Sequence, residues 1–496
     1  MDDQSAVIAF LSDPATHGGA KVERVDTHIS HVFLAGDRAY KLKRAVTLPF
    51  LDFAKLEDRQ RFCQKELEIN RRAAPMLYLG LKSITREADG RLAWDGKGEK
   101  LDQVIEMARF DEATLFDHLA AKGQLTRRQI EDLADVVVEM HQGGESASDW
   151  GGTAGIAHVI DTNDVTFRQF IGRPFEKPEI DALAGDSRQW LARLAPLLER
   201  RRLSGRVRRC HGDLHLGNIC MMDGRPVPFD AIEFNEEFAL IDQFYDLSFL
   251  LMDFDRRNLG EFAALLLSRC LAASNDVEAL AALPLFLSLR AAIRSHVAAA
   301  TGRPDEARSY FDWAKLYLHP NPPRLVAVGG LSGSGKSHLA RQLAPQIGAR
   351  PGALVLRSDV LRKHLMGVSP ETALPPSAYE EAVTERVYQN LLDQAERALH
   401  AGHAVIIDAV SAKPDQRRAI AALAGQTGVP FQGLWLNADA EALKTRVAER
   451  RNNASDATVA VVERQLRYDV GVMDWTEIDS SGDRADTLRQ AKAVLA

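Results

Sequence analysis

The chain has 496 residues, of which 46% are hydrophobic and 26% are charged, and its formal net charge is −7. This length exceeds a single ordinary hydrophobic core, so we expect two or three domains of soluble globular composition. The negative balance argues against a protein that binds nucleic acid through its overall charge.

The cysteines and the N-terminus indicate the compartment. Four cysteines are scattered along the chain without a C-x-x-C pair or zinc-finger spacing, and no H-E-x-x-H motif occurs. We therefore expect no zinc site and no disulfide framework, as in a reducing cytoplasm. The acidic N-terminus lacks the apolar core of a signal peptide, and no apolar run reaches the roughly 20 residues that span a bilayer. The prediction is a cytoplasmic protein without a membrane partner.

The first part of the chain begins with strand signals. Residues 28–44 form two strand-like runs around Gly36-Asp37, which is typical of a hairpin. Helical spacing follows over 56–74, and residues 100–110 again have the pattern of a strand. From about 112 to 205 the spacing is mostly helical, a strand is expected over 226–234, and helices continue to 317. A small β-rich lobe therefore precedes a larger helical lobe.

A proline-rich segment divides the chain. Three prolines lie within 319–323, where they disfavour a helix and favour extended backbone. We predict one domain over 1–318, a linker over 319–323 and a second domain over 324–496. Strand-like runs alternate with helical spacing in the second domain, which indicates an α/β fold with a parallel sheet. Its expected strands are 324–330, 353–359, 403–410, 431–438 and, more weakly, 475–481.

Residues 330–337 fit the phosphate-binding pattern G-x-x-x-x-G-K-[ST] in full. Glycines in such a loop allow main-chain amides to surround phosphate oxygens at the start of a helix. Lys336 is expected to reach the β- and γ-phosphates, and the Ser337 hydroxyl to ligate magnesium. The predicted nucleotide contacts are Gly330, Ser332, Gly333, Ser334, Gly335, Lys336 and Ser337. The motif predicts Mg²⁺ and ATP as cofactors.

Other residues in this domain have candidate roles. Asp408 ends an expected strand, where a carboxylate can hold magnesium. Asp359 ends another and is the candidate base for a hydroxyl substrate; the alternative is an N-cap of the next helix. Arg446 and Arg450 share a helix face that could close over ATP, the alternative being a solvated basic face. Residues 324–496 resemble P-loop kinases of the gluconate-kinase, zeta-toxin and polynucleotide-kinase types.

The run "HGDLHLGN" at 211–218 has the H-x-D-x-x-x-x-N spacing of a kinase catalytic loop. Asp213 can accept the proton of an attacking hydroxyl, and the Asn218 side chain can hold a metal. Asp230 ends an apolar run, where its carboxylate can connect magnesium to the phosphates. Base, amide and acid therefore occur in the order that phosphoryl transfer requires.

This motif resembles the loop of the aminoglycoside phosphotransferase and choline-kinase-like family, and the resemblance extends over about 25–300. It implies an α+β, protein-kinase-like fold with a lysine on a small-lobe strand and a glutamate on a helix. Lys41 and Lys43 are both candidates for the lysine, because side chains alternate along a strand and these two share one face. Lys41 is favoured, with Lys43 as the alternative. Glu66 is favoured over Glu68 as the partner.

Two further positions follow from that resemblance. Asp246 matches a family position that is usually structural. No G-x-G-x-x-G precedes Lys41, so the phosphate-covering loop would use Thr27, Ser30 or main-chain groups. The antibiotic kinases of this family also lack that glycine pattern, so the departure does not exclude activity.

Together these patterns predict two modules that each transfer the γ-phosphate of Mg-ATP to a hydroxyl of a small molecule. Two alternatives remain: one module is a nucleotide-sensing regulatory domain, or the P-loop module phosphorylates the 5′-hydroxyl of a polynucleotide. The sequence names neither acceptor and gives no oligomeric state.

Overall fold

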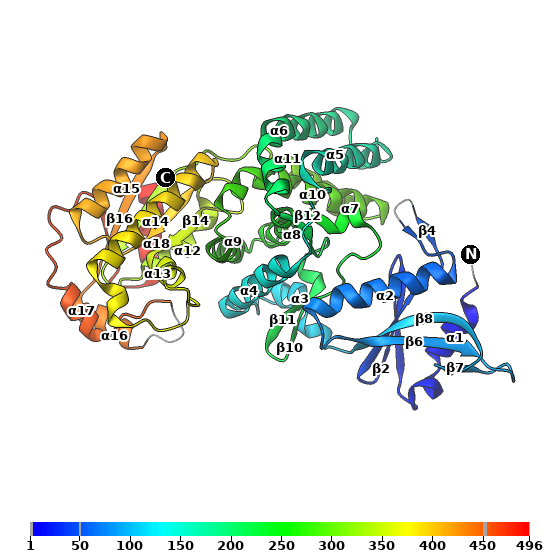
Figure 1. The fold of residues 1–496 in the computed structure, drawn as a ribbon. Coiled ribbons are helices and arrows are strands. Elements are labelled where there is room, and N and C mark those ends of the chain that lie inside the picture. The colour runs from blue at the N-terminus through cyan, green and yellow to red at the C-terminus, as the bar shows by residue number, and fades with distance from the viewer. Residues whose placement is uncertain (1–2, 49–50, 450–453, 496) are drawn as a thin grey trace. The chain divides into compact units, whose positions relative to one another are not determined.

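The structure is a computed structural model that describes residues 3–48, 51–449 and 454–495 (Figure 1). The chain folds into two compact units. The first unit comprises Met1–Ile156 and Pro196–Leu247, and the second comprises Ala157–Ala195 and Ser248–Ala496. The chain passes from one unit to the other within helices α5 (Gly152–Arg168), α6 (Lys177–Leu203) and α8 (Gln243–Arg256).

A six-stranded antiparallel sheet forms the small lobe of the first unit. Its strand order is β1-β2-β3-β8-β6-β7. Gly36 has a φ of 59° in the two-residue turn between β2 and β3, where Ala35 pairs with Arg38. The expected hairpin and the strand expected over 100–110 are confirmed. The strands are β1 (Val22–Asp26), β2 (Ser30–Ala35), β3 (Arg38–Lys43), β6 (Tyr78–Arg86), β7 (Leu92–Trp94) and β8 (Glu99–Ala108).

The two faces of this sheet are covered by different helices. Helix α2 (Leu56–Ala73) packs Cys63 and Leu67 against one face, and α1 (Ser5–Ser12) packs on the other. Because side chains alternate along β8, Ile105 lies in the first cluster and Val104 in the second. A 3₁₀ turn (Pro14–His17) follows α1, and β4 (Thr47–Leu48) and β5 (Leu51–Asp52) precede α2.

The rest of the first unit frames the loop at 210–218. Helices α3 (Phe116–Ala121) and α4 (Arg127–Gly143) belong to this part of the unit, and two short antiparallel strand pairs flank the loop. These are β9 (Val207–Arg209) with β12 (Leu240–Asp242), and β10 (Ile219–Met222) with β11 (Arg225–Pro228). The short helix α7 (Glu236–Ala239) precedes β12. The strand expected over 226–234 ends at Pro228, because Asp230 has a φ of 64° and leaves the extended conformation.

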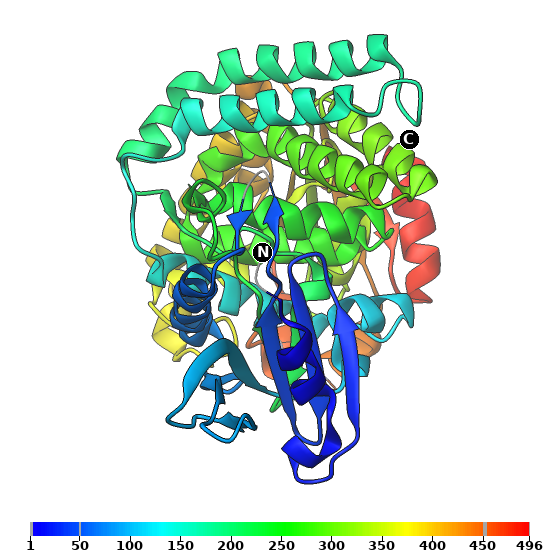
Figure 2. The same ribbon diagram turned by 90° about the vertical axis from the view of Figure 1, so that its right-hand side faces the viewer.

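The part of the second unit that precedes β13 (Leu325–Gly330) in the chain is helical, as the spacing of apolar residues predicted. Helices α5 and α6 run side by side, and Arg168 and Arg188 form ion pairs with Asp181 and Asp161 (Figure 2). The remaining helices are α9 (Gly260–Ser274), α10 (Leu283–Ala300) and α11 (Pro304–Tyr317), with a 3₁₀ segment at Val277–Ala282. No helix in the described ranges combines the length and apolarity that crossing a membrane requires.

The second unit also contains a five-stranded parallel sheet with the order β14-β15-β13-β16-β17. The strands are β13 (Leu325–Gly330), β14 (Leu354–Arg357), β15 (Val405–Asp408), β16 (Phe431–Asn437) and β17 (Thr476–Asp479). All five expected strands and the parallel α/β fold are confirmed. The helices between and after them are α12 (Lys336–Leu343), α13 (Ser358–Leu365), α14 (Glu381–His400), α15 (Pro414–Thr427), α16 (Ala440–Ala448), α17 (Val459–Gln465) and α18 (Arg484–Leu495).

Helix α9 belongs to the core of this parallel sheet. Ala264 is 2% exposed and lies in one hydrophobic cluster with Val326 and Leu339. The Ser268 hydroxyl accepts a hydrogen bond from the main-chain N–H of Val355 on β14, with an N–O distance of 3.0 Å. The packing therefore joins helices that precede the proline-rich segment to the P-loop sheet, whereas the sequence grouped them with the first domain.

Candidate active sites

Asp246 on α8 anchors the loop that contains Asp213. Its buried carboxylate accepts hydrogen bonds from the main-chain N–H groups of His211, at 3.3 Å, and Gly212, at 2.8 Å. His141 on α4 contacts the same carboxylate through Nε2 at 2.9 Å. Gly212 has a φ of 82°, and a Cβ there would lie 2.8 Å from a main-chain oxygen. Asp246 thus has the structural position that the family resemblance implied.

Asp213 and Asn218 are brought together by the same loop. The Asn218 side-chain nitrogen donates to the Asp213 main-chain oxygen at 3.0 Å and to its Oδ2 at 3.1 Å. Because the nitrogen makes both bonds, the amide oxygen of Asn218 is the atom that can ligate a cation. The Asn218 carbonyl accepts from the N–H of Phe229 at 2.9 Å, which places this residue next to the segment that contains Asp230.

Five ionisable side chains form a network in which Asp230 is the most exposed member. Lys41 Nζ donates to Glu66 Oε1 at 2.7 Å and to the Asp230 carboxylate. Lys43 Nζ donates to Glu66 Oε2 at 2.6 Å and to the Glu233 carboxylate. The side chain of Lys43 is 1% exposed, whereas Lys41 contacts an Asp230 side chain that is 45% exposed. This geometry favours Lys41 as the lysine that can reach a nucleotide.

The network sets the charge of its members. Burial raises the pKa of Glu66, but Lys41 and Lys43 outweigh burial and lower the pKa to about 2. Burial lowers the pKa of both lysines, and the facing carboxylates outweigh it and raise the pKa of each. Burial dominates at Glu233 and raises its pKa. Glu66 and the two lysines are therefore charged at neutral pH.

The alternatives considered for the small lobe lie elsewhere. Glu68 is exposed on α2 and accepts a hydrogen bond from Gln64 at 2.6 Å. Thr27 and Ser30 bond to each other in the turn between β1 and β2, where the Thr27 hydroxyl accepts from the Ser30 N–H at 2.9 Å. Sequence reasoning missed Glu233, for which the only signal was an acidic residue inside an apolar run.

The predicted phosphate loop joins β13 to α12. Gly330 has a φ of 133° and Gly333 a φ of 90°, and a Cβ at either would lie 2.6 Å from a main-chain oxygen. Glycine is therefore required at both positions. Lys336 Nζ donates to the Leu331 main-chain oxygen at 2.9 Å, and the Ser332 N–H donates to the Gln465 side chain at 2.8 Å. Ser334 and Gly335 lie inside the loop, and Ser337 follows Lys336 in α12.

The two acidic residues of this region differ in their placement. Asp408 is the last residue of β15, is 4% exposed, and accepts a hydrogen bond from Arg357 Nε at 3.2 Å. Asp359 does not end a strand, because β14 ends at Arg357. It lies in the first turn of α13, two residues after the N-cap residue Arg357, so the alternative N-cap role is also wrong. One turn later, the buried Arg362 donates to the Ala378 main-chain oxygen at 2.7 Å.

The predicted basic lid face is only partly described. Arg446 donates to the main-chain oxygens of Ser480, Ser481 and Gly482 at 2.8, 3.1 and 3.2 Å. It thereby stabilises the turn after β17, and its action on the phosphates stays a prediction. Arg450 lies outside the described residues.

Asp456, which the sequence analysis did not single out, accepts hydrogen bonds from three other residues. Its carboxylate accepts hydrogen bonds from Lys363 Nζ at 2.7 Å, from the Leu374 N–H at 3.1 Å and from the Tyr379 hydroxyl at 2.5 Å. Burial raises the pKa of Asp456, but these donors outweigh it and lower the pKa. Asp456 therefore fixes the loop between α13 and α14.

Comparisons with sequence families match both halves of the chain. Residues 88–283 match the model described as "Phosphotransferase enzyme family", and residues 325–469 match the model described as "AAA domain". The chain joins a phosphotransferase-family region to a P-loop region. The two resemblances found in the sequence are thereby confirmed. The first match includes Asp213, Asn218 and Asp230 and begins after Lys41 and Glu66.

Relatives align with this chain over nearly their full length. Uncharacterized proteins of Mycobacterium tuberculosis and Mycobacterium bovis are 28% identical over 486 residues, which cover 94% of this chain and 94% of theirs. Among solved structures, a choline/ethanolamine kinase family protein from Mesorhizobium loti is 14% identical, with a TM-score of 0.41, and covers 63% of this chain and 93% of its own. A sugar kinase from Janibacter is 21% identical, with a TM-score of 0.26, and covers 35% and 95%.

Proposed function

We propose that the chain is a phosphotransferase with two ATP sites, each of which transfers the γ-phosphate to a hydroxyl of a small molecule. The observation that carries the proposal is the pairing of Asp213 with Asn218 beside the Lys41–Asp230 contact. This arrangement supports the proposal for the phosphotransferase region, because a candidate base, an amide oxygen, a carboxylate and the Lys41 ammonium group belong to neighbouring segments of the first unit.

In the phosphotransferase region, Asp213 accepts the proton of the attacking hydroxyl. The Asn218 amide oxygen and the Asp230 carboxylate are hard oxygen donors, which fit Mg²⁺. Bound magnesium would neutralise phosphate charge. Lys41 orients the phosphates, and Glu66 holds Lys41 by a charge-assisted hydrogen bond of 2.7 Å.

In the P-loop region, the main-chain N–H groups of 330–337 and Lys336 bind the phosphates. The Ser337 hydroxyl and the Asp408 carboxylate fit Mg²⁺ by the same donor chemistry. Asp359, at the start of α13, is the candidate base for the second acceptor. Arg446 and Arg450 remain candidates for neutralising charge in the transition state.

The test uses the intact chain with labelled ATP and a panel of hydroxyl metabolites. We expect Asp213→Asn to abolish transfer to one group of acceptors and Lys336→Ala to abolish transfer to another. Asp223→Asn is the matched control, because Asp223 is exposed in a turn with a φ of 49° that Asn also adopts. If Asp213→Asn leaves all transfer intact while Lys336→Ala removes it, the first region is not an enzyme. Salt-sensitive phosphorylation of an oligonucleotide 5′-hydroxyl would instead identify a polynucleotide acceptor.

A further inference from the structure

The backbone at Asp230 has a conformation that needs support. Its φ of 64° lies in the left-handed region, which non-glycine residues rarely adopt. Such a conformation persists when the surrounding contacts fix it. Asp230 follows β11, and its carboxylate is the proposed ligand for magnesium, so the contacts that fix this backbone also fix the ligand.

Two side chains of the small lobe accept hydrogen bonds from successive main-chain N–H groups at this turn. The Asp230 N–H donates to the Tyr78 hydroxyl oxygen at 3.1 Å, and the Ala231 N–H donates to Asn70 Oδ1 at 2.9 Å. Asn70 Nδ2 in turn donates to the Glu66 main-chain oxygen at 3.0 Å. One amide side chain therefore connects the turn at Asp230 to the helix turn that contains the partner of Lys41.

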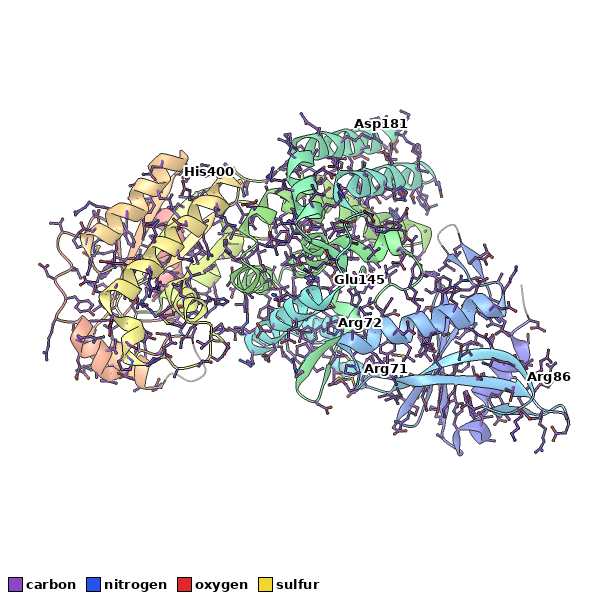
Figure 3. All side chains as sticks on the ribbon, viewed as in Figure 1. Arg71, Arg72, Arg86, Glu145, Asp181 and His400 are labelled. Atoms are coloured by element: carbon purple, nitrogen blue, oxygen red, sulfur yellow. The ribbon has the colours of Figure 1, made fainter. Side chains whose placement is uncertain are left out.

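Both side chains are held from several directions. Tyr78 is 0% exposed and Asn70 is 2% exposed. Arg71, labelled in Figure 3 near the end of α2, donates through Nε to the Tyr78 main-chain oxygen at 2.8 Å. Tyr78 also packs in the cluster that contains Cys63 and Leu67 of α2. These contacts hold the main chain and the ring of Tyr78, and through the ring they limit where its hydroxyl can lie.

We propose that Tyr78 and Asn70 are positioning residues that aim the Asp230 carboxylate at the magnesium of the phosphotransferase site. The inference rests on the proposed function of that region. The two residues act on the main chain rather than on the reacting atoms. Tyr78 holds the N–H of Asp230, and Asn70 holds the N–H of the next residue, Ala231. Asn70 also donates to the Glu66 main-chain oxygen. One side chain therefore fixes the position of Glu66, the partner of Lys41, relative to the turn that contains Asp230.

The experiment measures metal binding directly. The full chain with Lys336→Ala, which weakens nucleotide binding at the P-loop, is titrated with Mn²⁺ in the presence of a non-hydrolysable ATP analogue. Electron paramagnetic resonance reports the free Mn²⁺. Adding Asp230→Asn identifies the part of the binding that depends on Asp230. Tyr78→Phe removes only the hydroxyl, and Tyr40→Phe, in the cluster on the opposite face of the sheet, is the matched control.

We expect Tyr78→Phe to weaken the Asp230-dependent Mn²⁺ binding about tenfold, the effect of losing one buried hydrogen bond. In EDTA, which removes the metal, Tyr78→Phe should bind the ATP analogue with unchanged affinity. This result is expected if the substitution affects only the metal ligand Asp230. Asn70→Ala should weaken Mn²⁺ binding by at least as much. Unchanged Mn²⁺ affinity in Tyr78→Phe overturns the inference while leaving the proposed function in place. If no Mn²⁺ binding depends on Asp230, the proposed function of this region fails, and the inference fails with it.

Discussion

Lys43 and Glu66 form an ion pair 2.6 Å long in which both side chains are almost completely buried. Lys41 occupies the other oxygen of the same carboxylate. Residues two apart on a strand share a face, so a single carboxylate on α2 can meet both lysines. The two lysines nevertheless have different second partners: the buried Glu233 for Lys43, and the half-exposed Asp230 for Lys41. This difference predicts different roles.

Lys43→Met should mainly lower stability. It leaves Glu233 and one oxygen of Glu66 buried without their cation, a loss of about 3–5 kcal/mol in the free energy of unfolding. Urea unfolding of the full chain, followed by a probe in the first unit, measures the effect. Lys41→Met is the matched control and should cost less, because Asp230 can be solvated when its partner is removed. Equal losses in the two variants would contradict the assignment.

Lys41→Met should mainly lower activity. If Lys41 orients phosphates and stabilises developing charge, as proposed, its removal is expected to reduce kcat/KM for ATP about 10²- to 10³-fold. The assay uses the acceptors whose phosphorylation depends on Asp213, with the P-loop site weakened by Lys336→Ala. Near-normal turnover in Lys41→Met, together with inactivity of a folded Lys43→Met, would assign the nucleotide contact to Lys43 instead.

Ala264→Asp should destabilise the P-loop region, although residue 264 precedes the proline-rich segment. The substitution buries a carboxylate in the hydrophobic cluster that contains Val326 and Leu339, at a cost of about 3 kcal/mol or more. Ala273→Asp, at an exposed position of the same helix, should cost only tenths of a kcal/mol. Thermal unfolding with and without ATP compares the two variants. Equal melting temperatures would show that α9 does not support this sheet.

His403 is one of two buried histidines that should make the second unit lose stability in mild acid; burial lowers the pKa of the other, His296, to about 4 as well. The His403 side chain is 1% exposed, and burial lowers its pKa to about 4. The unfolded chain takes up the proton near pH 6.5, so the stabilisation is complete above that pH and is lost as the pH falls toward 4. The loss approaches about 3 kcal/mol for this one group.

Unfolding measured between pH 7 and pH 4 tests this dependence. His403→Gln retains a donor for the Gly352 main-chain oxygen, which His403 Nε2 contacts at 2.9 Å. It should make the pH profile less steep and leave the part that His296 contributes. His400→Gln, exposed at the end of α14, is the control and should leave the profile unchanged. A profile that is equally steep in both variants would assign the acid sensitivity to other groups.

Features encoded in short stretches of sequence were predictable. The structure contains the P-loop, the five parallel strands and the loop at 211–218. Each of these is determined mainly by residues that are adjacent in the sequence. Asp359 was assigned to a strand end because an apolar run does not reveal that the helix begins at Ser358. Lys41 was favoured over Lys43, but strand alternation gives both lysines the same face, so the local pattern does not reveal their different second partners. The bond between Asn70 and Ala231 joins residues 161 positions apart, and no local spacing encodes such a contact.

The division into units has a consequence for the history of the gene. The chain crosses from one unit to the other three times, after residues 156, 195 and 247. No single recombination breakpoint, at the proline codons or elsewhere, can therefore exchange one whole unit for that of a distant homologue. Single-crossover chimaeras of two homologues test this consequence. Folded chimaeras should be recovered only when the parents are so similar that segments of one can pack against helices of the other. The two candidate active sites are thus expected to be inherited together rather than reassorted.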